Sequence, residues 1–142
     1  MRTWVHVAAS AIISALLHPF FGWIGAIMIM AGGVLIDIDH YFSYIMRYKK
    51  WNIQECYRFY SRQVDAVDFS ENEGILLIFH TIEFLSLAIF LSFYFTAALA
   101  FLAGLSIHSV LDLIYLWRVP KKFVANHSAI IWLILNSENK RV

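Results

Sequence analysis

The sequence predicts an all-α integral membrane protein: a four-helix bundle with an interfacial helix in its loop and a short C-terminal amphipathic helix. Its 142 residues are 61% hydrophobic and only 15% charged, whereas soluble domains average roughly 45–50% apolar residues. The apolar residues form runs close to the roughly 20 that a helix needs to cross a bilayer. The Lys and Arg residues cluster between these runs. We therefore expect one membrane domain over residues 1–142.

The first two expected spans cover residues 3–20 and 22–39. The first is apolar apart from three side chains, which are His6, Ser10 and His18. We expect this helix to end at His18-Pro19, because proline disfavours helix for the residue before it. A tight turn then returns the chain across the membrane toward Asp39.

The segment 41–73 is the expected cytoplasmic loop, and it interleaves five basic residues with aromatic ones. This mixture suits the headgroup layer of a membrane. Asn52 followed by Glu55 predicts a capping box at the start of a short interfacial helix. Apolar residues then recur at helical spacing, at Ile53, Tyr57, Tyr60 and Val64. A solvated loop is the alternative.

The remaining spans are expected over residues 74–96 and 97–117. The C-terminal apolar segment, 123–135, is interrupted by Asn126-His127-Ser128 and is short for a membrane crossing. We expect an interfacial or partly inserted helix there.

The distribution of basic residues predicts the orientation. Arg2, the loop and the segment after residue 117 hold basic residues, whereas the turns near Pro19 and Thr96 hold none. Because Lys and Arg concentrate on the cytoplasmic side, this predicts a multi-pass protein of the cell (inner) membrane with both termini in the cytoplasm.

Ionisable residues lie near the cytoplasmic ends of these spans. On a helix, His80 and Glu83 would lie about 60° apart, and His108 and Asp112 about 40° apart, so each pair shares a face. Asp39 can point the same way as Asp37 only where the helix loosens at its end. The candidate metal ligands are His6, Asp37, Asp39, His40, His80, Glu83, His108 and Asp112.

These donors predict a site for one or two divalent ions. Imidazole and carboxylate together suit zinc first, and also iron or manganese. Small residues at four-residue steps, Ala100 and Gly104 before His108 and Gly33 before Asp37, would let the helices approach closely. Buried ion pairs without a metal are the alternative. Ionisable residues inside a membrane are functional by default, which favours the metal.

The motifs Asp37-Ile-Asp39-His40 and His108-Ser-Val-Leu-Asp112 resemble a family of small inner-membrane metal-dependent hydrolases (YdjM-like), which are similar to zinc-dependent phospholipases C. His6 matches an early histidine of that pattern. Many members carry H-R-G-x-x-H-S before the third span, whereas here only His80-Thr81 fits, and Ile75 stands where the first histidine would be. The resemblance implies a subgroup in which Glu83 replaces the missing ligand.

The expected function is hydrolysis of a lipid or lipid-linked ester at the cytoplasmic leaflet. Glu83 and Asp112 are the expected catalytic carboxylates, with Glu83 as general base or as ligand. The alternatives are a di-iron membrane oxidase or desaturase, and a non-catalytic metal-binding or transport protein. The expected partner is membrane lipid, and a net charge of +1 gives no argument for nucleic acid. The oligomeric state is left open.

Overall fold

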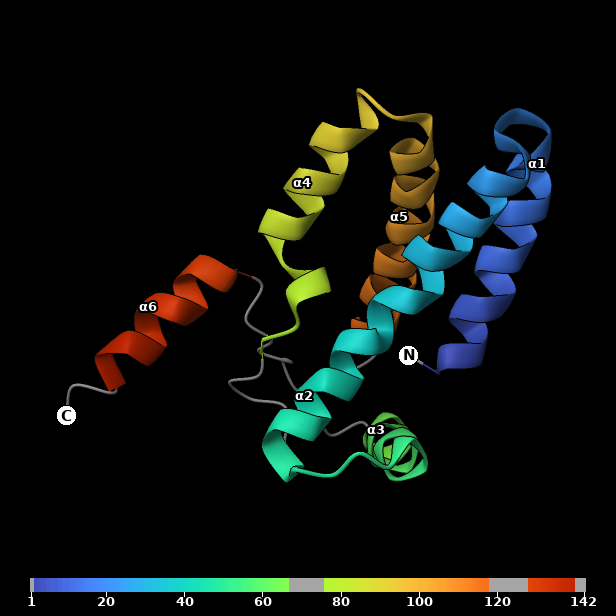
Figure 1. Cartoon of the computed structure of the whole chain (residues 1–142). Coiled ribbons are helices and arrows are strands. Elements are labelled where there is room, and N and C mark those ends of the chain that lie inside the picture. The colour runs from blue at the N-terminus through green and yellow to red at the C-terminus, as the bar shows by residue number, and fades with distance from the viewer. Residues whose placement is uncertain (1, 67–75, 118–127, 140–142) are drawn as a thin grey trace. The chain divides into compact units, whose positions relative to one another are not determined.

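The computed structural model describes residues 2–66, 76–117 and 128–139, and these residues form helices joined by turns (Figure 1). The all-α class is therefore confirmed. The chain forms two compact units. Unit 1 consists of Met1–Asp37 and Ser86–Pro120, and unit 2 of Ile38–Leu85 and Lys121–Val142. The expected single domain stays a prediction.

Helix α1 (Thr3–Val34) is folded back on itself as a hairpin (Figure 1). The reversal occurs at Gly22, whose φ of 63° lies in the left-handed region that glycine adopts without strain. The Ser14 hydroxyl donates to the carbonyl of Ala26 across the hairpin, at 3.0 Å. The two expected segments are thus present, but the predicted end at Pro19 is wrong. Pro19 stays inside the helix, and the glycine three residues later makes the turn.

Helix α5 (Thr96–Leu116) packs closely against α1 within unit 1. A Cβ atom on Gly104 would overlap the carbonyl oxygen of Ile29, and one on Gly33 would overlap the Ser10 hydroxyl. Ala100 is fully buried in the same contact. The small residues therefore allow backbone to approach backbone, as their spacing predicts.

Apart from Ile29, Ile36 and Leu105, the side chains that unit 1 buries are mainly small or polar, whereas many of its large apolar side chains are exposed. His6, Ser10, Ser14 and His108 are buried, whereas the exposed side chains of α1 include Ile12, Leu16, Phe20, Trp23, Ile24 and Ile27. This pattern is the reverse of a water-soluble core, in which large apolar side chains are the ones removed from solvent. It is the pattern that a hydrocarbon solvent favours.

The third predicted span, 74–96, is not one continuous helix. Residues 74 and 75 lie outside the described part of the chain. Then η3 (Ile78–His80) and α4 (Ile82–Ser92) are separated by Thr81, whose backbone is extended. The Thr81 hydroxyl accepts a hydrogen bond from the Phe84 amide at 3.3 Å, which caps the start of α4. His80 and Glu83 therefore do not share one helix face, and that prediction is wrong.

In unit 2, α2 (Ile38–Tyr48) and α3 (Ile53–Ala66) pack through aromatic side chains. The rings of Tyr44, Tyr48 and Phe59 lie 5.0–5.6 Å apart. Half of the predicted capping box is confirmed, because the Asn52 side chain accepts from the amides of residues 54 and 55, whereas the Glu55 carboxylate pairs with Lys50. The face of α3 that packs includes Cys56 and Gln63, which are buried. This face is not the one predicted from the apolar spacing, since Ile53 and Tyr57, two residues of that pattern, are exposed.

Helix α6 (Ala129–Asn139) confirms a helix in the C-terminal segment. The first part of the predicted segment, 123–127, lies outside the described residues and includes His127. The predicted basic residues Arg118, Lys121 and Lys122 also lie outside them.

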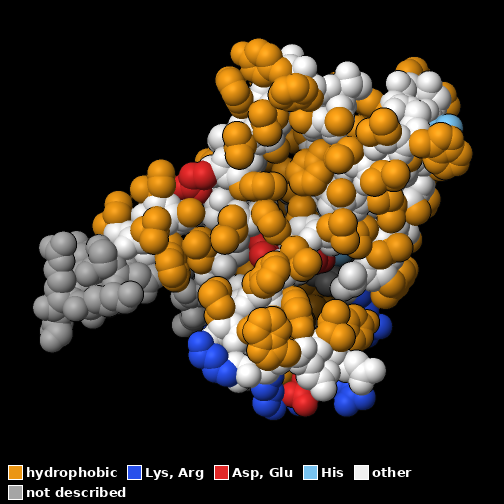
Figure 2. Space-filling view, viewed as in Figure 1, with side chains coloured by type: hydrophobic (Ala, Val, Ile, Leu, Met, Phe, Trp, Pro, Cys, Tyr) orange, Lys and Arg blue, Asp and Glu red, His pale blue; other side chains and the backbone are white. Residues whose placement is uncertain are grey.

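Two helical stretches, Thr3–Tyr48 and Thr96–Tyr115, are long and apolar enough to cross a membrane by length and composition. Helix α4 has 11 residues and spans about 16 Å, roughly half of a bilayer's hydrocarbon core. On the face shown in Figure 2, apolar side chains cover most of the surface.

Candidate metal centre

A first group of donors lies inside unit 1, where α1 meets α5. His6 Nε2 lies 3.3 Å from Asp112 Oδ1, and His108 Nε2 lies 3.1 Å from Asp112 Oδ2. Both histidines are buried, at 1% and 0% exposure. Their rings stack with centroids 4.0 Å apart. The structure therefore brings these three predicted residues together as a potential metal-binding group.

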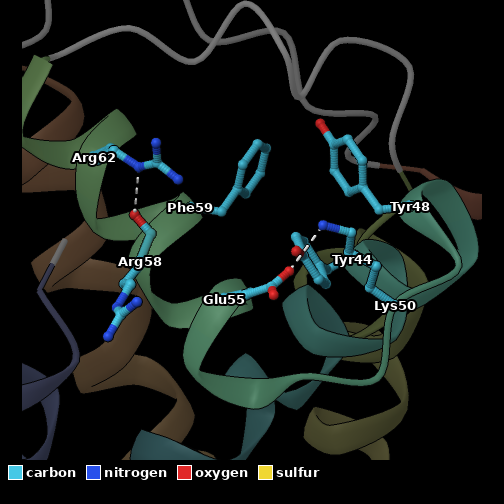
Figure 3. Close-up of a pocket in the computed structure, with 7 residues that line it drawn as sticks. All are labelled: Tyr44, Tyr48, Lys50, Glu55, Arg58, Phe59 and Arg62. Atoms are coloured by element: carbon cyan, nitrogen blue, oxygen red, sulfur yellow. Dashed lines mark hydrogen bonds and ion pairs between the residues drawn. The ribbon is translucent and has the colours of Figure 1, made fainter.

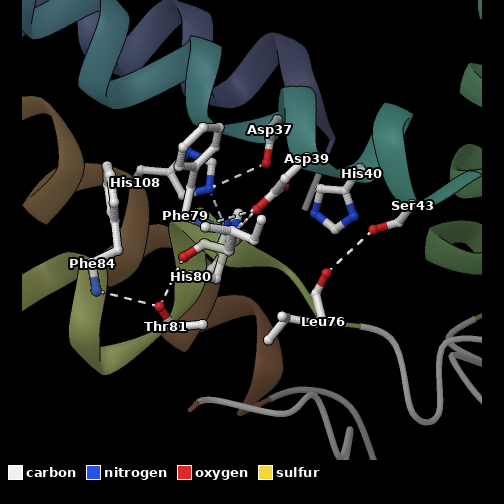
Figure 4. A network of polar contacts seen from close by, with 12 residues as sticks. Asp37, Asp39, His40, Ser43, Leu76, Phe79, His80, Thr81, Phe84 and His108 are labelled. Carbon is white, nitrogen blue, oxygen red and sulfur yellow. Dashed lines mark hydrogen bonds and ion pairs between the residues drawn. The ribbon is translucent and has the colours of Figure 1, made fainter. Parts of the chain in front are cut away.

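Asp37 joins the same histidine from the other end of the α1 hairpin. It ends the short 3₁₀ turn η1 (Leu35–Asp37), and its Oδ1 lies 3.4 Å from His108 Nε2 (Figure 4). The helix was expected to fray at Asp39, but the change comes earlier, as a 3₁₀ turn, and α2 (Ile38–Tyr48) then continues through Asp39. Ligands around a tetrahedral zinc ion at 2.0–2.1 Å lie about 3.3 Å from one another. The separations in this group match that value.

The backbone of α1 orients the His108 ring. Its Nδ1 lies 3.0 Å from the carbonyl oxygen of Gly33. Gly33 belongs to the last turn of α1, where carbonyl groups lack partners within the helix. A carbonyl can only accept a hydrogen bond, so Nδ1 must carry the proton. In the neutral ring, Nε2 then presents its lone pair.

This orientation creates an electrostatic requirement. The Nε2 lone pair of a neutral His108 would face oxygens of Asp37 and Asp112, which are acceptors as well. Three acceptors converge favourably only around a positive charge. That charge is either a proton on Nε2 or a metal ion. Stacking at 4.0 Å makes it costly for His6 and His108 both to be protonated, whereas two neutral imidazoles are normal metal ligands.

A second group of donors lies inside unit 2 and contains Asp39, His40 and His80. Asp39 Oδ2 accepts from the Phe79 amide at 3.1 Å and lies 3.1 Å from His80 Nδ1 (Figure 4). The rings of His40 and His80 have centroids 5.5 Å apart. Asp39 is buried, and its second oxygen, Oδ1, has no hydrogen-bond partner among the described residues. An ionised carboxylate oxygen in that position is costly unless a cation compensates it.

Glu83 has a different environment in the structure. Its carboxylate accepts hydrogen bonds from the Ser128 hydroxyl at 2.5 Å, the Ala129 amide at 3.1 Å and the Ile130 amide at 3.3 Å. It therefore satisfies the amino end of α6, which a negative charge also stabilises through the helix dipole. Within unit 2, the described group of metal donors does not include it.

Three hydrogen-bond partners of the predicted site residues were not themselves predicted from the sequence. They are the Gly33 carbonyl, the Phe79 amide and Ser128. Backbone groups leave no mark in side-chain patterns, so the first two had no signal. The role of Ser128 could have been predicted from the sequence, because a serine directly before an apolar run is a common helix cap. It caps α6 by accepting from the Ile131 amide at 3.3 Å.

Comparison with models of protein families, with curated proteins and with solved structures finds no match to this chain. The family resemblance suggested by the motifs therefore stays a prediction.

Proposed function

We propose that this chain is a membrane-embedded, metal-dependent hydrolase that cleaves a lipid or lipid-linked ester at the cytoplasmic leaflet. His6, Asp37, His108 and Asp112 are the proposed ligands of one ion. Asp39, His40 and His80 are the proposed ligands of a second. The observation that carries the proposal is the convergence of the His108 Nε2 lone pair with carboxylate oxygens, because it calls for a positive charge at that point.

The membrane part of the proposal is supported by the inverted burial of unit 1. In the proposed arrangement, the two arms of α1 and helix α5 cross the bilayer. The stretch from Leu77 to Ser92 makes the remaining passage, so both termini are cytoplasmic. The basic residues of α2 and α3 then lie on the cytoplasmic side, in agreement with the positive-inside rule.

The exposure of the ligands supports access to substrate. The histidines of the first group are buried, whereas the side chains of Asp37 and Asp112 are 23% and 26% exposed. The carboxylates therefore mark the accessible side of the group. The chemistry that a divalent ion supplies in such a place is Lewis acidity, which lowers the pKa of water to about 7 and polarises a phosphoryl or acyl oxygen.

The chain's own residues prepare this site. The Gly33 carbonyl fixes the tautomer of His108, which is a common device for orienting a metal-binding imidazole. Asp112 uses one oxygen for each histidine and so holds both rings in register. Asp112 is also the proposed proton acceptor, because its side chain lies on the accessible side of the donor group, whereas the Glu83 carboxylate binds the start of α6.

The test compares two histidine variants of the purified full-length protein. His108→Gln removes a proposed ligand, whereas His18→Gln changes a histidine of α1 that packs on Trp23 with ring centroids 4.4 Å apart. Elemental analysis should find bound divalent metal in the wild type and in His18→Gln. We expect His108→Gln to bind it at least about tenfold more weakly.

Activity is then measured on a panel of phospholipids, with release of headgroup or fatty acid as the readout. We expect release by the wild type, and its loss with a chelator and in His108→Gln. Metal content equal in all three proteins would remove the proposed ligand set. Bound metal without release of any product would favour the non-catalytic alternative, and redox-active iron would favour the oxidase.

A further inference from the structure

The surface of unit 2 contains a pocket of about 310 Å³ between α2 and α3 (Figure 3). Helix α2 contributes two tyrosines, the connection contributes a lysine, and α3 contributes the remaining side chains. The lining residues are Tyr44, Tyr48, Lys50, Glu55, Arg58, Phe59 and Arg62. The pocket therefore combines aromatic rings with three cations and one carboxylate.

The single carboxylate is neutralised within the pocket. Lys50 Nζ lies 3.0 Å from Glu55 Oε2. Their hydrogen bond and opposite charges raise the pKa of the amine and lower the pKa of the carboxyl, so both stay ionised at neutral pH. The two arginines are left as excess positive charge. Arg62 donates its Nε to the Arg58 carbonyl at 3.3 Å, and among the described residues its terminal amino groups stay available for a ligand.

An apolar site adjoins this cationic pocket. A second pocket, of about 360 Å³, is lined by Ile53, Gln54, Tyr57 and Arg58. Arg58 thus lines both pockets. Ile53 is 67% exposed and Tyr57 is 58% exposed. The preceding Trp51 is 76% exposed as well, so large apolar side chains stand next to the positive charge.

Excess charge beside exposed apolar side chains complements an amphiphile with an anionic head. Guanidinium groups recognise phosphate through paired hydrogen bonds, and exposed aromatic and aliphatic side chains partition into the acyl boundary of a membrane. The described part of α2, α3 and their connection holds five basic residues, namely Arg47, Lys49, Lys50, Arg58 and Arg62. On the face shown in Figure 2, Lys and Arg side chains gather over this segment among apolar ones.

We propose that the pocket between α2 and α3 binds the phosphate of an anionic phospholipid, with the acyl region of the lipid against Ile53 and Tyr57. Arg58 and Arg62 hold the phosphate, and Tyr48 closes the opposite side of the pocket. The site uses none of the metal donors. Its success or failure is therefore separate from that of the hydrolase proposal.

The test measures equilibrium binding of three probes to the full-length protein in a neutral detergent: dioctanoyl phosphatidylglycerol, dioctanoyl phosphatidylcholine and inorganic phosphate. We expect phosphatidylglycerol to bind at least about tenfold more tightly than either of the others. Equal binding of the two lipids would overturn recognition of an anionic head. Inorganic phosphate binding as tightly as phosphatidylglycerol would overturn the role of the apolar site.

Matched variants locate the site. Arg62→Gln and Lys49→Gln each remove one exposed positive charge, but only Arg62 lines the pocket. We expect Arg62→Gln to weaken phosphatidylglycerol binding about tenfold, as loss of charge-assisted hydrogen bonds does. Lys49→Gln should change it less than twofold. Equal effects of the two variants would show that general charge attraction, and no built pocket, holds the lipid.

Discussion

At the scale of single residues, Asp39 gives the clearest test of the second metal site. Asp39→Asn keeps the size of the side chain and an acceptor for the Phe79 amide, but it removes the negative charge. If an ion binds Asp39, His40 and His80, this variant should hold about one equivalent less metal than the wild type. Elemental analysis checks the loss, and helix content by circular dichroism checks that the chain stays folded.

Asp65→Asn is the matched control, since Asp65 is an exposed carboxylate at the end of α3, outside both donor groups. It should leave metal content unchanged. If Asp39→Asn also keeps the full content, the aspartate serves only to bind the Phe79 amide and His80.

The residues that could donate to a metal ion were predictable from the sequence, whereas their grouping was only partly predictable. His108 and Asp112 form a pair because four residues make about one helical turn, which spacing alone predicts. The pairing of Asp39 with His80 joins residues that lie 41 positions apart in the chain. The break at Thr81 also shifts Glu83 away from the helix face that ideal geometry assigns to it.

At the scale of elements, Glu83 connects α4 to α6. Glu83→Gln keeps the shape of the side chain but replaces a charged acceptor by a neutral amide at the start of α6. We expect a local destabilisation of α6, because its first amides lose a charged hydrogen-bond acceptor. The readout is faster amide hydrogen exchange in α6, with unchanged metal content.

Glu55→Gln is the control for this variant, since it removes an exposed ion pair with Lys50, and such pairs contribute little. It should leave exchange in α6 unchanged. A fall in metal content in Glu83→Gln would instead favour the role of ligand that the sequence predicts.

The helices themselves follow from composition, but their ends depend on competition between local signals. Proline at position 19 is tolerated inside α1, because the helix can continue when a neighbouring group takes over the lost hydrogen bond. Gly22 then sets the turn, since only glycine adopts its conformation without strain. Thr81 ends η3 and caps α4. The sequence did not predict this break, because the hydropathy of residues 74–96 indicates one continuous apolar segment.

At the scale of the whole molecule, the proposed topology can be tested by cysteine labelling. Cys56 is the only cysteine. It is buried, and burial raises the pKa of its thiol from 9.0 to about 11, so it reacts slowly at pH 7. A Ser61→Cys variant should react with a membrane-permeant maleimide in intact cells, and with an impermeant one only after the membrane is opened. Labelling of intact cells by the impermeant reagent would reverse the orientation.

Because unit 1 buries polar side chains and exposes large apolar ones, water can destabilise its internal contacts. A soluble domain is held together because water avoids its core, whereas here serines, glycine backbone and histidines meet inside and bulk apolar groups face outward. Water that penetrates between the arms of α1, or between α1 and α5, would compete directly for the Ser14 and His108 hydrogen bonds. Extraction conditions that keep the helices dry, such as long-chain mild detergents or lipid discs, therefore protect the very contacts that short-chain detergents would dissolve.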